Sequence, residues 1–344
     1  SRGLGDVYKR QHIHIVDSKG TRVIGNLIGS TQTTGTYGVK VESSAEVVRR
    51  VVIANNDIIQ QGTAIYVGSN CPNGVISSNY IEAGEEGIYI SAESWSITGN
   101  EIYNISNYGI QIKSSSNSVV GNVVHTITNY SGISITSYNN IISANNIGDA
   151  GYHGIHVNGA KNIIANNVCF ENGRFGILLD PLASRCIVLA NSCFNNSQET
   201  SNTYDGIRLN DNANNYIARN FCFDDQDTPT QRYAIAEAGT ADGNYIMNNI
   251  VESCASGAIS VVGANTVVKE NIGYVTENSG TATGTGAQQT IAHGCNFTPT
   301  DANIILSNID DGANPYISAD PDSTNIYITA VSGKKYRWEV KRHP

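Results

Sequence analysis

The 344-residue sequence predicts an all-β protein built from a repeated unit, because two short phrases recur along most of the chain. One phrase is an apolar residue, two variable residues, an Asn, one variable residue and a second apolar residue, as in Ile76-x-x-Asn79-x-Ile81. The other is Gly or Ala followed by an apolar, a variable and another apolar residue, as at Gly154. Self-similarity at a nearly fixed period predicts a solenoid.

The spacing of the Asn phrase predicts the kind of solenoid. Successive Asn residues lie 21 to 30 positions apart, so a coil has about 21 residues and the excess forms loops. Apolar and polar residues alternate with period two, as in strands, and neither the leucine pattern nor the helical half of a leucine-rich repeat is present. The remaining solution is a right-handed parallel β-helix of about eleven coils over residues 12–278, with its eleven repeated Asn residues at Asn26, Asn56, Asn79, Asn100, Asn122, Asn145, Asn166, Asn191, Asn220, Asn249 and Asn271.

The repeated Asn residues are expected to be structural. Coils stack at roughly 4.8 Å, so equivalent amides can donate and accept hydrogen bonds along the axis. Asn also tolerates the left-handed backbone that a sharp corner requires. These residues therefore predict the architecture and say nothing of the activity.

Composition limits the partners. The chain has 34 Gly, one Met, 15% charged residues and a net charge of −9, which is typical of a turn-rich, secreted β-protein and argues against binding nucleic acid. No apolar stretch approaches the roughly 20 residues of a membrane span. The expected location is extracellular or on a virion surface.

The seven Cys residues are an odd number without metal-type pair spacing. Cys193 and Cys222 share an apolar repeat position, and Cys169 lies one residue beyond it. We expect them to pack as small core residues, without disulfides or a metal site.

Both ends of the chain lie outside the repeat. Residues 1–11 begin without Met, and Gly5 to Gln11 resembles a translated adapter sequence, so we expect a non-native or unstructured leader there. Residues 279–286 are small and lack an apolar pattern, which predicts a linker. Residues 287–344 then predict five short antiparallel strands, a small sandwich-like module, at 289–294, 303–306, 316–319, 324–330 and 335–340.

Two phrases of this module, residues 286–294 and 324–330, resemble the terminal β-modules that follow β-helices in viral tail spikes and related secreted proteins. The repeats themselves resemble those of the pectate-lyase-like β-helix superfamily. The resemblance implies a module that caps the last coil and holds a homotrimer together, and a shaft that recognises a surface polysaccharide.

Candidate site residues lie on the outer face of the Gly-apolar-x-apolar phrases. Residues between and beside the inward apolar positions form three columns, which together make one elongated strip. Between the coils of Gly154 and Gly206 the strip collects acids, cations and imidazoles, and these are the catalytic candidates His153, His156, Asp180, Asp205 and Arg208. The substrate-binding candidates along or near the strip are Tyr89, Lys113, Asn158, Asn210, Tyr204 and Tyr233.

This set of residue types suits two reactions on polysaccharides. A uronate lyase or epimerase needs an Arg to hold the sugar carboxylate and a His or Tyr to take the C5 proton, for which His156 and Arg208 are available. A glycoside hydrolase needs two carboxylates roughly 5 to 9 Å apart, for which Asp180 and Asp205 are the pair. The loops 195–204 and 224–232 are expected to wall a groove beside these residues.

The segment from Phe175 to Pro181 resembles the Tyr-Gly-Phe-Asp-Pro-His motif of mannuronan C-5-epimerases. It has two extra residues before Asp180, and Leu182 stands where the family has His. The resemblance therefore leaves the catalytic His unassigned.

Alternatives remain for the strip and for the chain. The polar cluster could bind a glycan without chemistry or be a solvated face, and the whole protein could be a non-catalytic structural or adhesive shaft. The acidic run from Asp224 to Asp227 is a candidate Ca²⁺ site, with a solvated loop as the alternative. No other cofactor or metal is expected.

Overall fold

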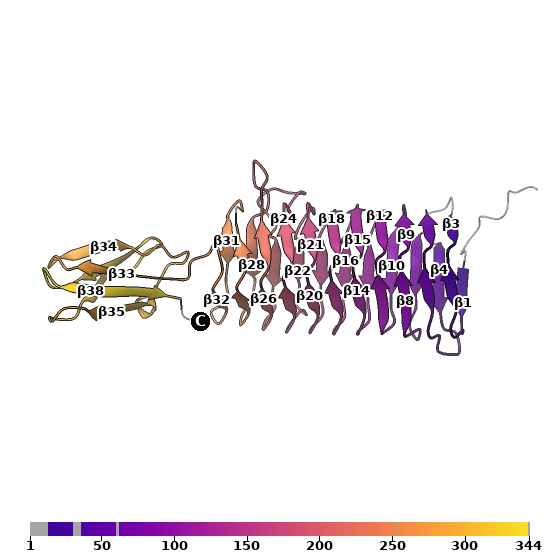
Figure 1. The fold of residues 1–344 in the computed structure, drawn as a ribbon, viewed down its shortest axis with the longest axis horizontal. Coiled ribbons are helices and arrows are strands. Elements are labelled where there is room, and N and C mark those ends of the chain that lie inside the picture. Colours follow the sequence, from indigo (N-terminus) through magenta and orange to yellow (C-terminus); the bar gives the residue numbers. More distant parts are fainter. Residues whose placement is uncertain (1–12, 30–35, 60–61, 253, 343–344) are drawn as a thin grey trace, which may run out of the picture.

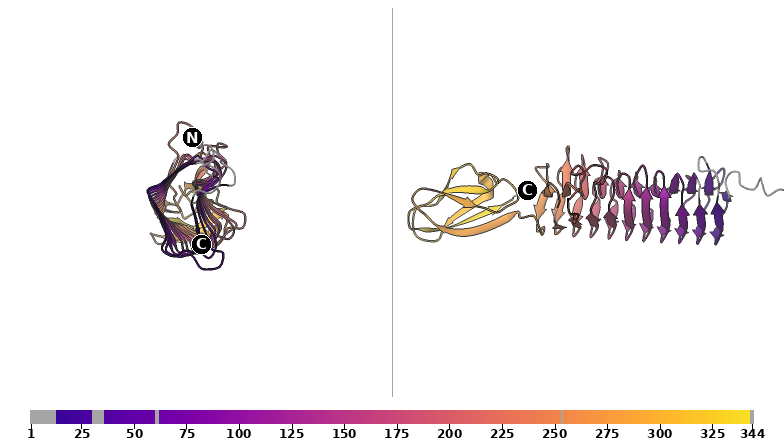
Figure 2. Two further views of the ribbon diagram at one scale, coloured as in Figure 1. Left: turned by 90° about the vertical axis from the view of Figure 1, so that its right-hand side faces the viewer. Right: turned by 90° about the horizontal axis from the view of Figure 1, so that it is seen from above.

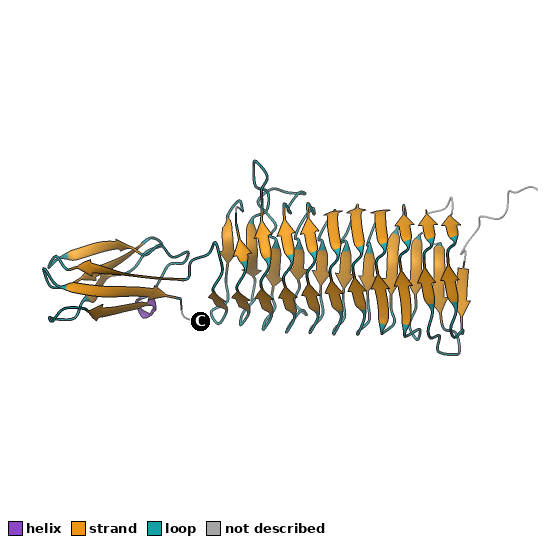
Figure 3. Ribbon diagram, viewed as in Figure 1, coloured by secondary structure: helices purple, strands orange, loops and turns teal. Residues whose placement is uncertain are grey.

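A computed structural model describes residues 13–29, 36–59, 62–252 and 254–342 (Figure 1). The predicted leader 1–11 lies outside these residues. The described chain is a long shaft followed by a small module, and almost all of its regular structure is strand (Figure 3). Within the described residues no helix has the length and apolarity to span a membrane.

The shaft is a right-handed parallel β-helix of three parallel sheets, as predicted. The first sheet comprises β1 (Ile13–Val16), β4 (Tyr37–Glu42), β7 (Thr63–Val67), β10 (Glu86–Ile90), β13 (Ile110–Ile112), β16 (Ile133–Ile135), β19 (Ile155–Val157), β22 (Ile177–Leu179), β25 (Ile207–Asn210), β28 (Tyr233–Ala238) and β31 (Gly257–Ser260). The second comprises β2 (Arg22–Ile24), β5 (Val52–Ala54), β8 (Gly74–Ser77), β11 (Trp95–Thr98), β14 (Ser118–Val120), β17 (Ile141–Ser143), β20 (Ile163–Ala165), β23 (Ile187–Leu189), β26 (Tyr216–Ala218), β29 (Tyr245–Met247) and β32 (Val267–Lys269). The third comprises β3 (Leu27–Gly29), β6 (Asp57–Ile59), β9 (Tyr80–Glu82), β12 (Glu101–Ile105), β15 (Val123–Ile127), β18 (Asn146–Ala150), β21 (Val168–Phe170), β24 (Ser192–Phe194), β27 (Phe221–Phe223) and β30 (Ile250–Val251).

The core runs along the axis of the shaft, inside the ring of coils that Figure 2 shows end-on. Inward Ile and Val side chains stack on their equivalents in neighbouring coils, as with Ile142 on Ile164. Cys169, Cys193 and Cys222 also stack in register, which corrects the expected one-residue offset of Cys169. Burial raises the pKa of the Cys193 and Cys222 thiols well above its usual value, so both stay protonated. The three are core residues with free thiols.

The Asn ladder forms the corner between the second and third sheets. Each ladder Asn accepts hydrogen bonds at its Oδ1 from the backbone and side-chain nitrogens of the previous ladder Asn, at 3.0 and 2.9 Å for Asn122 on Asn145. Its own Nδ2 also donates to a backbone carbonyl, as Asn145 does to Val119 at 2.9 Å. The ladder thus satisfies polar groups that the dry corner would otherwise leave unpaired.

Two details of the ladder differ from the prediction. The seventh rung is Asn167, and Asn166 points elsewhere. The left-handed backbone belongs to the residue before each rung, with φ +57° at Asn166 and +54° at Ala144. The residue with positive φ turns the chain, and the following rung residue fills the corner with its side chain. In this coil both residues are Asn: Asn166 makes the turn and Asn167 is the rung.

The other two corners use the same device, which the sequence analysis missed. Between the first and second sheets, the backbone nitrogen of Asn117 donates to Asn140 and that of Asn140 to Asn162, each at 2.8 Å. Between the third and first sheets, Asn172 and Asn196 join at 2.9 Å. These ladders are shorter because loops interrupt the corners.

At the C-terminal end of the shaft, Glu237 takes an inward position on β28 opposite Leu209 and is buried. Its carboxylate accepts hydrogen bonds from Asn244 Nδ2 at 2.8 Å, Thr266 Oγ1 at 2.6 Å and Gly263 N at 3.0 Å. The apolar core therefore gives way to a polar network before the last coil ends.

The C-terminal module has two antiparallel three-stranded sheets around a core that includes Tyr336 and Trp338. Its elements are β33 (Glu277–Thr283), β34 (Gln288–Ala292), the 3₁₀-helix η1 (Asp301–Asn303), β35 (Ile304–Asn308), β36 (Tyr316–Ala319), β37 (Asn325–Thr329) and β38 (Lys335–Lys341). The five predicted strands are present, but most of the expected linker 279–286 belongs to a sixth, β33. Gly280 lies opposite Trp338, and a side chain there would collide with the indole, so the small residues serve packing and not flexibility.

The module lies beyond the last coil along the axis (Figure 1). None of its described strands pairs with β31 or β32, so it does not extend the sheets of the shaft. The junction is made by hydrogen bonds such as Asn296 N to Val275 O at 2.8 Å and Arg342 N to Thr276 O at 3.0 Å.

Replacing a ladder Asn should destabilise the shaft, whereas replacing its exposed neighbour should not. Asn145→Ala leaves the buried Val119 carbonyl and Asn122 amide unpaired, which we expect to cost about 2–4 kcal/mol of unfolding free energy. Asn146→Ala, at an outward position of β18, should change it by less than about 0.5 kcal/mol. Urea denaturation measures both, and equal losses in the two variants would contradict the assigned register.

Candidate functional site

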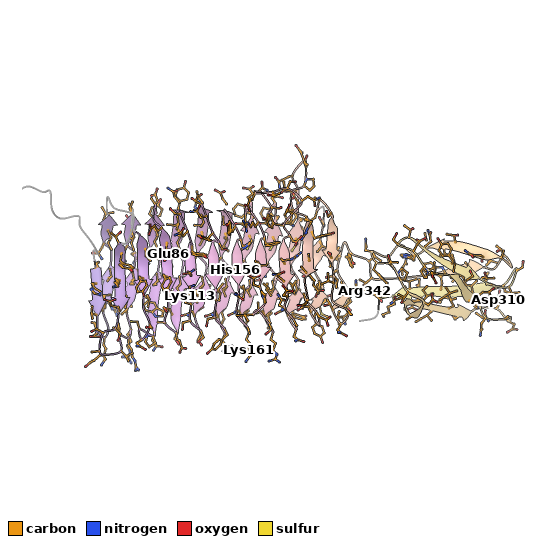
Figure 4. All side chains as sticks on the ribbon, turned by 180° about the vertical axis from the view of Figure 1, so that it is seen from behind. Glu86, Lys113, His156, Lys161, Asp310 and Arg342 are labelled. Carbon is orange, nitrogen blue, oxygen red and sulfur yellow. The ribbon has the colours of Figure 1, made fainter. Side chains whose placement is uncertain are left out.

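The strip predicted from the sequence is the outer face of the first sheet. The pairing of consecutive strands places Ser134, His156, Leu178 and Arg208 in one column. Figure 4 shows Glu86, Lys113 and His156 on this face, and Lys161 at the corner away from it. The register of the strip is therefore confirmed.

His156 and Asp180 are hydrogen-bonded to each other on neighbouring coils. His156 Nε2 lies 2.7 Å from Asp180 Oδ2, and Asn210 Nδ2 donates to Asp180 Oδ1 at 3.3 Å. The hydrogen bond from His156 lowers the pKa of Asp180. Since an ionised carboxylate only accepts, we assign the proton to Nε2, and a neutral His156 then has its lone pair on Nδ1. A carboxylate that orients an imidazole in this way makes it a competent base.

Arg208 belongs to an ion-pair cluster. Asp205 is completely buried and accepts from Arg208 Nη1 at 3.0 Å. It also accepts from Arg232 Nε at 2.9 Å and Arg232 Nη2 at 2.8 Å, and from the backbone of Tyr233. The hydrogen bonds to Asp205 raise the pKa of Arg232, while burial lowers the pKa of Arg208. Two guanidinium groups on one carboxylate leave the Arg208–Asp205–Arg232 cluster itself with a net positive charge.

The burial of Asp205 corrects its predicted role. A carboxylate with no exposed surface and three guanidinium contacts neither touches a substrate nor exchanges protons with it. Asp205 is instead a positioning residue for Arg208 and Arg232. The hydrolase pair of Asp180 and Asp205 is thereby disfavoured, because Asp180 is also bound to His156.

His153 is also buried, with 8% of its surface exposed, although it belongs to an outward column. Its ring stacks on Phe175 at 5.3 Å and lies 5.6 Å from the ring of His156. Its Nδ1 has no hydrogen-bond partner among the described residues. Burial, aided by the nearby His156 and Arg174, lowers the pKa of His153 to about 3. His153 is therefore a neutral ring packed beside the base, and not a second base.

The predicted substrate-binding residues divide into three groups. Asn158 and Asn210 support the fold of the site, because Asn158 Oδ1 accepts from Leu182 N at 3.2 Å and Asn210 binds Asp180. Tyr204 packs edge-on against Phe175 at 5.0 Å, and Tyr233 lies next to the Arg232 guanidinium.

Tyr89 and Lys113 lie on earlier coils, closer to the N-terminus. Tyr89 stacks on Tyr66 with the ring centroids 5.1 Å apart. Because β10 is three strands from β19, Tyr89 lies roughly 14 Å along the axis from His156. A polymer, and not a single sugar, would be needed to reach both.

The sequence analysis did not identify Arg232 as a member of the ion-pair cluster, or Phe175 as the aromatic ring that packs against His153 and Tyr204. The position of each residue in the sequence could have indicated its role. Arg232 ends the second of the two long loops, immediately before a strip position, and Phe175 occupies the strip column between His153 and Asp205.

The two long loops flank the first sheet at its corner with the third, and they stand out from the shaft in Figure 1. They are bound to each other, through Asn202 N to Thr230 O at 2.6 Å and Arg232 N to Tyr204 O at 2.7 Å. The two loops thus form a single hydrogen-bonded structure beside the first sheet.

The acidic run in the second loop serves that loop. Asp224 is buried and accepts from Gln226 N at 3.1 Å and from Thr230 N and Gln231 N at 2.7 Å each. Its oxygens are therefore engaged by N–H donors and not arranged for Ca²⁺. In the described part of the chain no group of three or more His, Cys, Asp or Glu residues is placed to hold a metal ion.

Comparison with known families agrees with this architecture. The family model for the right-handed β-helix region matches residues 86–220 and 122–272, which together span more than half of the chain, so the protein belongs to the right-handed β-helix family. The model for the periplasmic copper-binding protein NosD matches residues 6–140. A search of curated protein sequences finds no match.

Several solved structures share the fold. The mannuronan C-5 epimerase AlgE6 A-module of Azotobacter vinelandii is 13% identical with a TM-score of 0.60, over 77% of this chain and 84% of that one. The Dettilon tailspike protein is 13% identical with a TM-score of 0.62, over 96% and 86%. A variant of the periplasmic alginate epimerase AlgG is 15% identical with a TM-score of 0.55, over 76% and 73%. At these identities the likeness shows the fold alone.

Acid should weaken the shaft through His153. The unfolded chain takes up this proton near the ordinary pKa of 6.5 and the folded chain only near 3, so stability is lost as the pH falls between the two values. His153→Phe, which removes the titration and keeps a ring, should flatten the change in urea midpoint between pH 7 and about 4. His125→Phe, at the half-buried His125 ring beside Tyr103, is the control. A wild-type pH dependence in the His153 variant would show that other groups cause it.

Proposed function

We propose that this protein binds an acidic polysaccharide along the first sheet and abstracts a proton from its uronate residues, as a lyase or an epimerase. His156 acts as the base, Asp180 orients it, and Arg208 receives the sugar carboxylate. The observation that carries the proposal is the placement of the His156–Asp180 pair and the Arg208–Asp205–Arg232 cluster on one face, one strand apart.

The chemistry fits these groups. The C5 proton of a uronate becomes acidic when positive charge stabilises the negative charge that develops on the carboxylate. His156 and Arg208 lie in the same column, two strands apart, with roughly 10 Å between their backbones. Both side chains can therefore reach one sugar that lies between them. When His156 takes the proton on Nδ1, the resulting imidazolium is stabilised by the Asp180 carboxylate.

The comparisons support a role in polysaccharide chemistry without defining it. Two of the structures that share the fold bear the names of alginate or mannuronan epimerases, and a third is a tailspike. In this chain the segment that resembles the epimerase motif includes Asp180, which binds the proposed base. A polymer substrate also suits a protein that works outside the cell or on a virion surface.

The competing function is that of an adhesive shaft, which would bind a glycan on the same face and leave it intact. The open geometry of the strip favours this reading, because the strip is the outer face of one sheet and the His156 and Asp180 side chains on it are partly exposed to solvent. A glycan that binds to the protein and is recovered chemically unchanged would favour the adhesive function over the catalytic one.

Activity is tested with a panel of uronic-acid polymers and bacterial capsules, by following unsaturated products in the ultraviolet and epimerised residues by NMR. We expect His156→Ala and Arg208→Ala each to lower turnover at least about a hundredfold. Lys40→Ala, on the same column but paired with Glu42 near the other end, should retain it. Equal turnover in all three variants would place the active site elsewhere.

We also propose that the chain self-associates, as the homotrimer implied by its C-terminal module. Support comes from consecutive strands of the second sheet that expose apolar side chains, which are Ile141, Ile163, Ile187, Tyr216 and Tyr245. Contiguous exposed apolar residues mark association surfaces.

Light scattering should give the mass of three chains for the wild type and of one chain for an Ile163→Glu/Ile187→Glu variant. Val123→Glu, at an equally exposed position of the third sheet, is the control and should stay trimeric. A monomeric wild type would contradict the proposal.

A further inference from the structure

A groove runs along the corner between the third and first sheets, outside the strip. Two hollows of about 470 and 400 Å³ join there and share Thr128, Gly151 and Glu199 as lining residues. We call this the corner groove. Tyr130 and Tyr152 line one end, and Asp149 and Glu171 line the other.

Gly151 and Gly173, on two consecutive coils, line the hollow with backbone alone. Gly151 N donates to Ile127 O and Gly173 N donates to Ala150 O, which stacks Thr128, Gly151 and Gly173 above one another. A Cβ on either glycine would lie 2.0 Å from a carbonyl oxygen of the preceding coil, so neither position accepts a side chain. Two stacked coils that present only backbone here span roughly 10 Å along the axis, which is the length of two sugar rings.

The rim at the tyrosine end offers the groups that recognise sugars. Tyr130 is 40% exposed and packs against Tyr108 and Tyr152. The hydroxyls of Tyr130 and Tyr152 and the side-chain amides of Asn107 and Asn129 make no hydrogen bond to any described residue. Apolar ring surface combined with free hydroxyl and amide groups is suited to the C–H faces and hydroxyls of a carbohydrate.

The charge of the corner groove differs from that of the strip. Its ionisable lining groups are the carboxylates of Asp149, Glu171 and Glu199. The nearby cation, Arg174, is committed to Glu199, with Nη2 to Oε1 at 3.3 Å, and lies 3.6 Å over the Tyr152 ring. A uronate would meet net negative charge here, so the groove favours uncharged sugars.

The corner groove adjoins the proposed active site. The Tyr152 ring lies 6.0 Å from that of His153, which in turn lies 5.6 Å from that of His156. Arg174 also reaches the Tyr204 ring, at 5.6 Å. One glycan chain can therefore occupy both places at once.

We propose that the corner groove binds neutral sugar residues of the same polysaccharide whose uronate lies at Arg208. The substrate is then a heteropolysaccharide with both neutral and acidic sugars, and not a homopolymer of uronates. The position of the acidic sugars in this inference rests on the proposed function. The binding of neutral sugars in the corner groove is tested independently of it.

The test is calorimetric titration of the full chain with neutral tetrasaccharides of glucose, galactose, mannose and N-acetylglucosamine, and with a mannuronate tetrasaccharide as the acidic probe. We expect a neutral tetrasaccharide to bind, and Tyr130→Ala and Asn129→Ala to weaken that binding at least tenfold. Arg208→Ala should leave neutral binding unchanged, and Tyr130→Ala should leave mannuronate binding unchanged. Tyr138→Ala, an exposed tyrosine at another corner, is the matched control, and thermal unfolding verifies that each variant is folded.

The outcomes separate the two proposals. Absence of neutral binding, or an equal loss in the Tyr138 variant, would overturn the corner groove as a sugar site. Neutral binding that depends on Tyr130, without binding or turnover of any acidic glycan, would support the groove and overturn the uronate chemistry at His156 and Arg208.

Discussion

The structure depends on one buried interaction, the axial hydrogen bonding of corner amides. In a dry corner each backbone N–H and C=O needs a partner, and the ladder Asn supplies both a donor and an acceptor at every coil. Because each rung must meet the next, the ladder sets the register of all three sheets. The Ile and Val stacks fill the space that this register defines.

That register also allows loops to grow without moving the sheets. Asn191 and Asn220 are 29 positions apart, and Asn100 and Asn122 only 22, yet both pairs join through amides at 3.0 and 2.9 Å. The extra residues leave the shaft as the loops 195–204 and 224–232. Functional groups from remote parts of the chain thus arrive at fixed positions, as His156 and Asp180 do across 24 residues.

The columns and the coil number follow from periodicity, so the sequence predicts them well. The misplaced rung at Asn166 arose because two adjacent Asn residues fit the phrase equally, and only the backbone conformation separates them. The alternation of inward and outward residues along a strand did not predict which outward side chains are buried. Asp205 and His153 point outward, but they are covered by Arg232 and Phe175, which come from other coils. The corner groove was not predicted because its lining residues come from the turns of several coils and do not form a sequence motif.

The strip and the corner groove offer different kinds of recognition: the strip offers positive charge, and the corner groove offers a hollow lined by rings and polar groups. The strip holds two arginines around one buried carboxylate, while the corner groove holds tyrosines, amides and acids. Such a division suits a polymer that presents different sugars to adjacent parts of a rigid shaft. Because the shaft is rigid before binding, its side chains and loops lose little conformational entropy when a glycan binds.

In the proposed binding mode, the glycan contacts the first sheet and its corner with the third. Carbene footprinting of side chains, with and without a polysaccharide selected by the activity panel, tests it most directly. We expect reduced labelling in segments 128–134, 152–158, 174–180 and 204–210, with no change on the outer face of the second sheet. Protection confined to the second sheet or to the C-terminal module would contradict this binding mode.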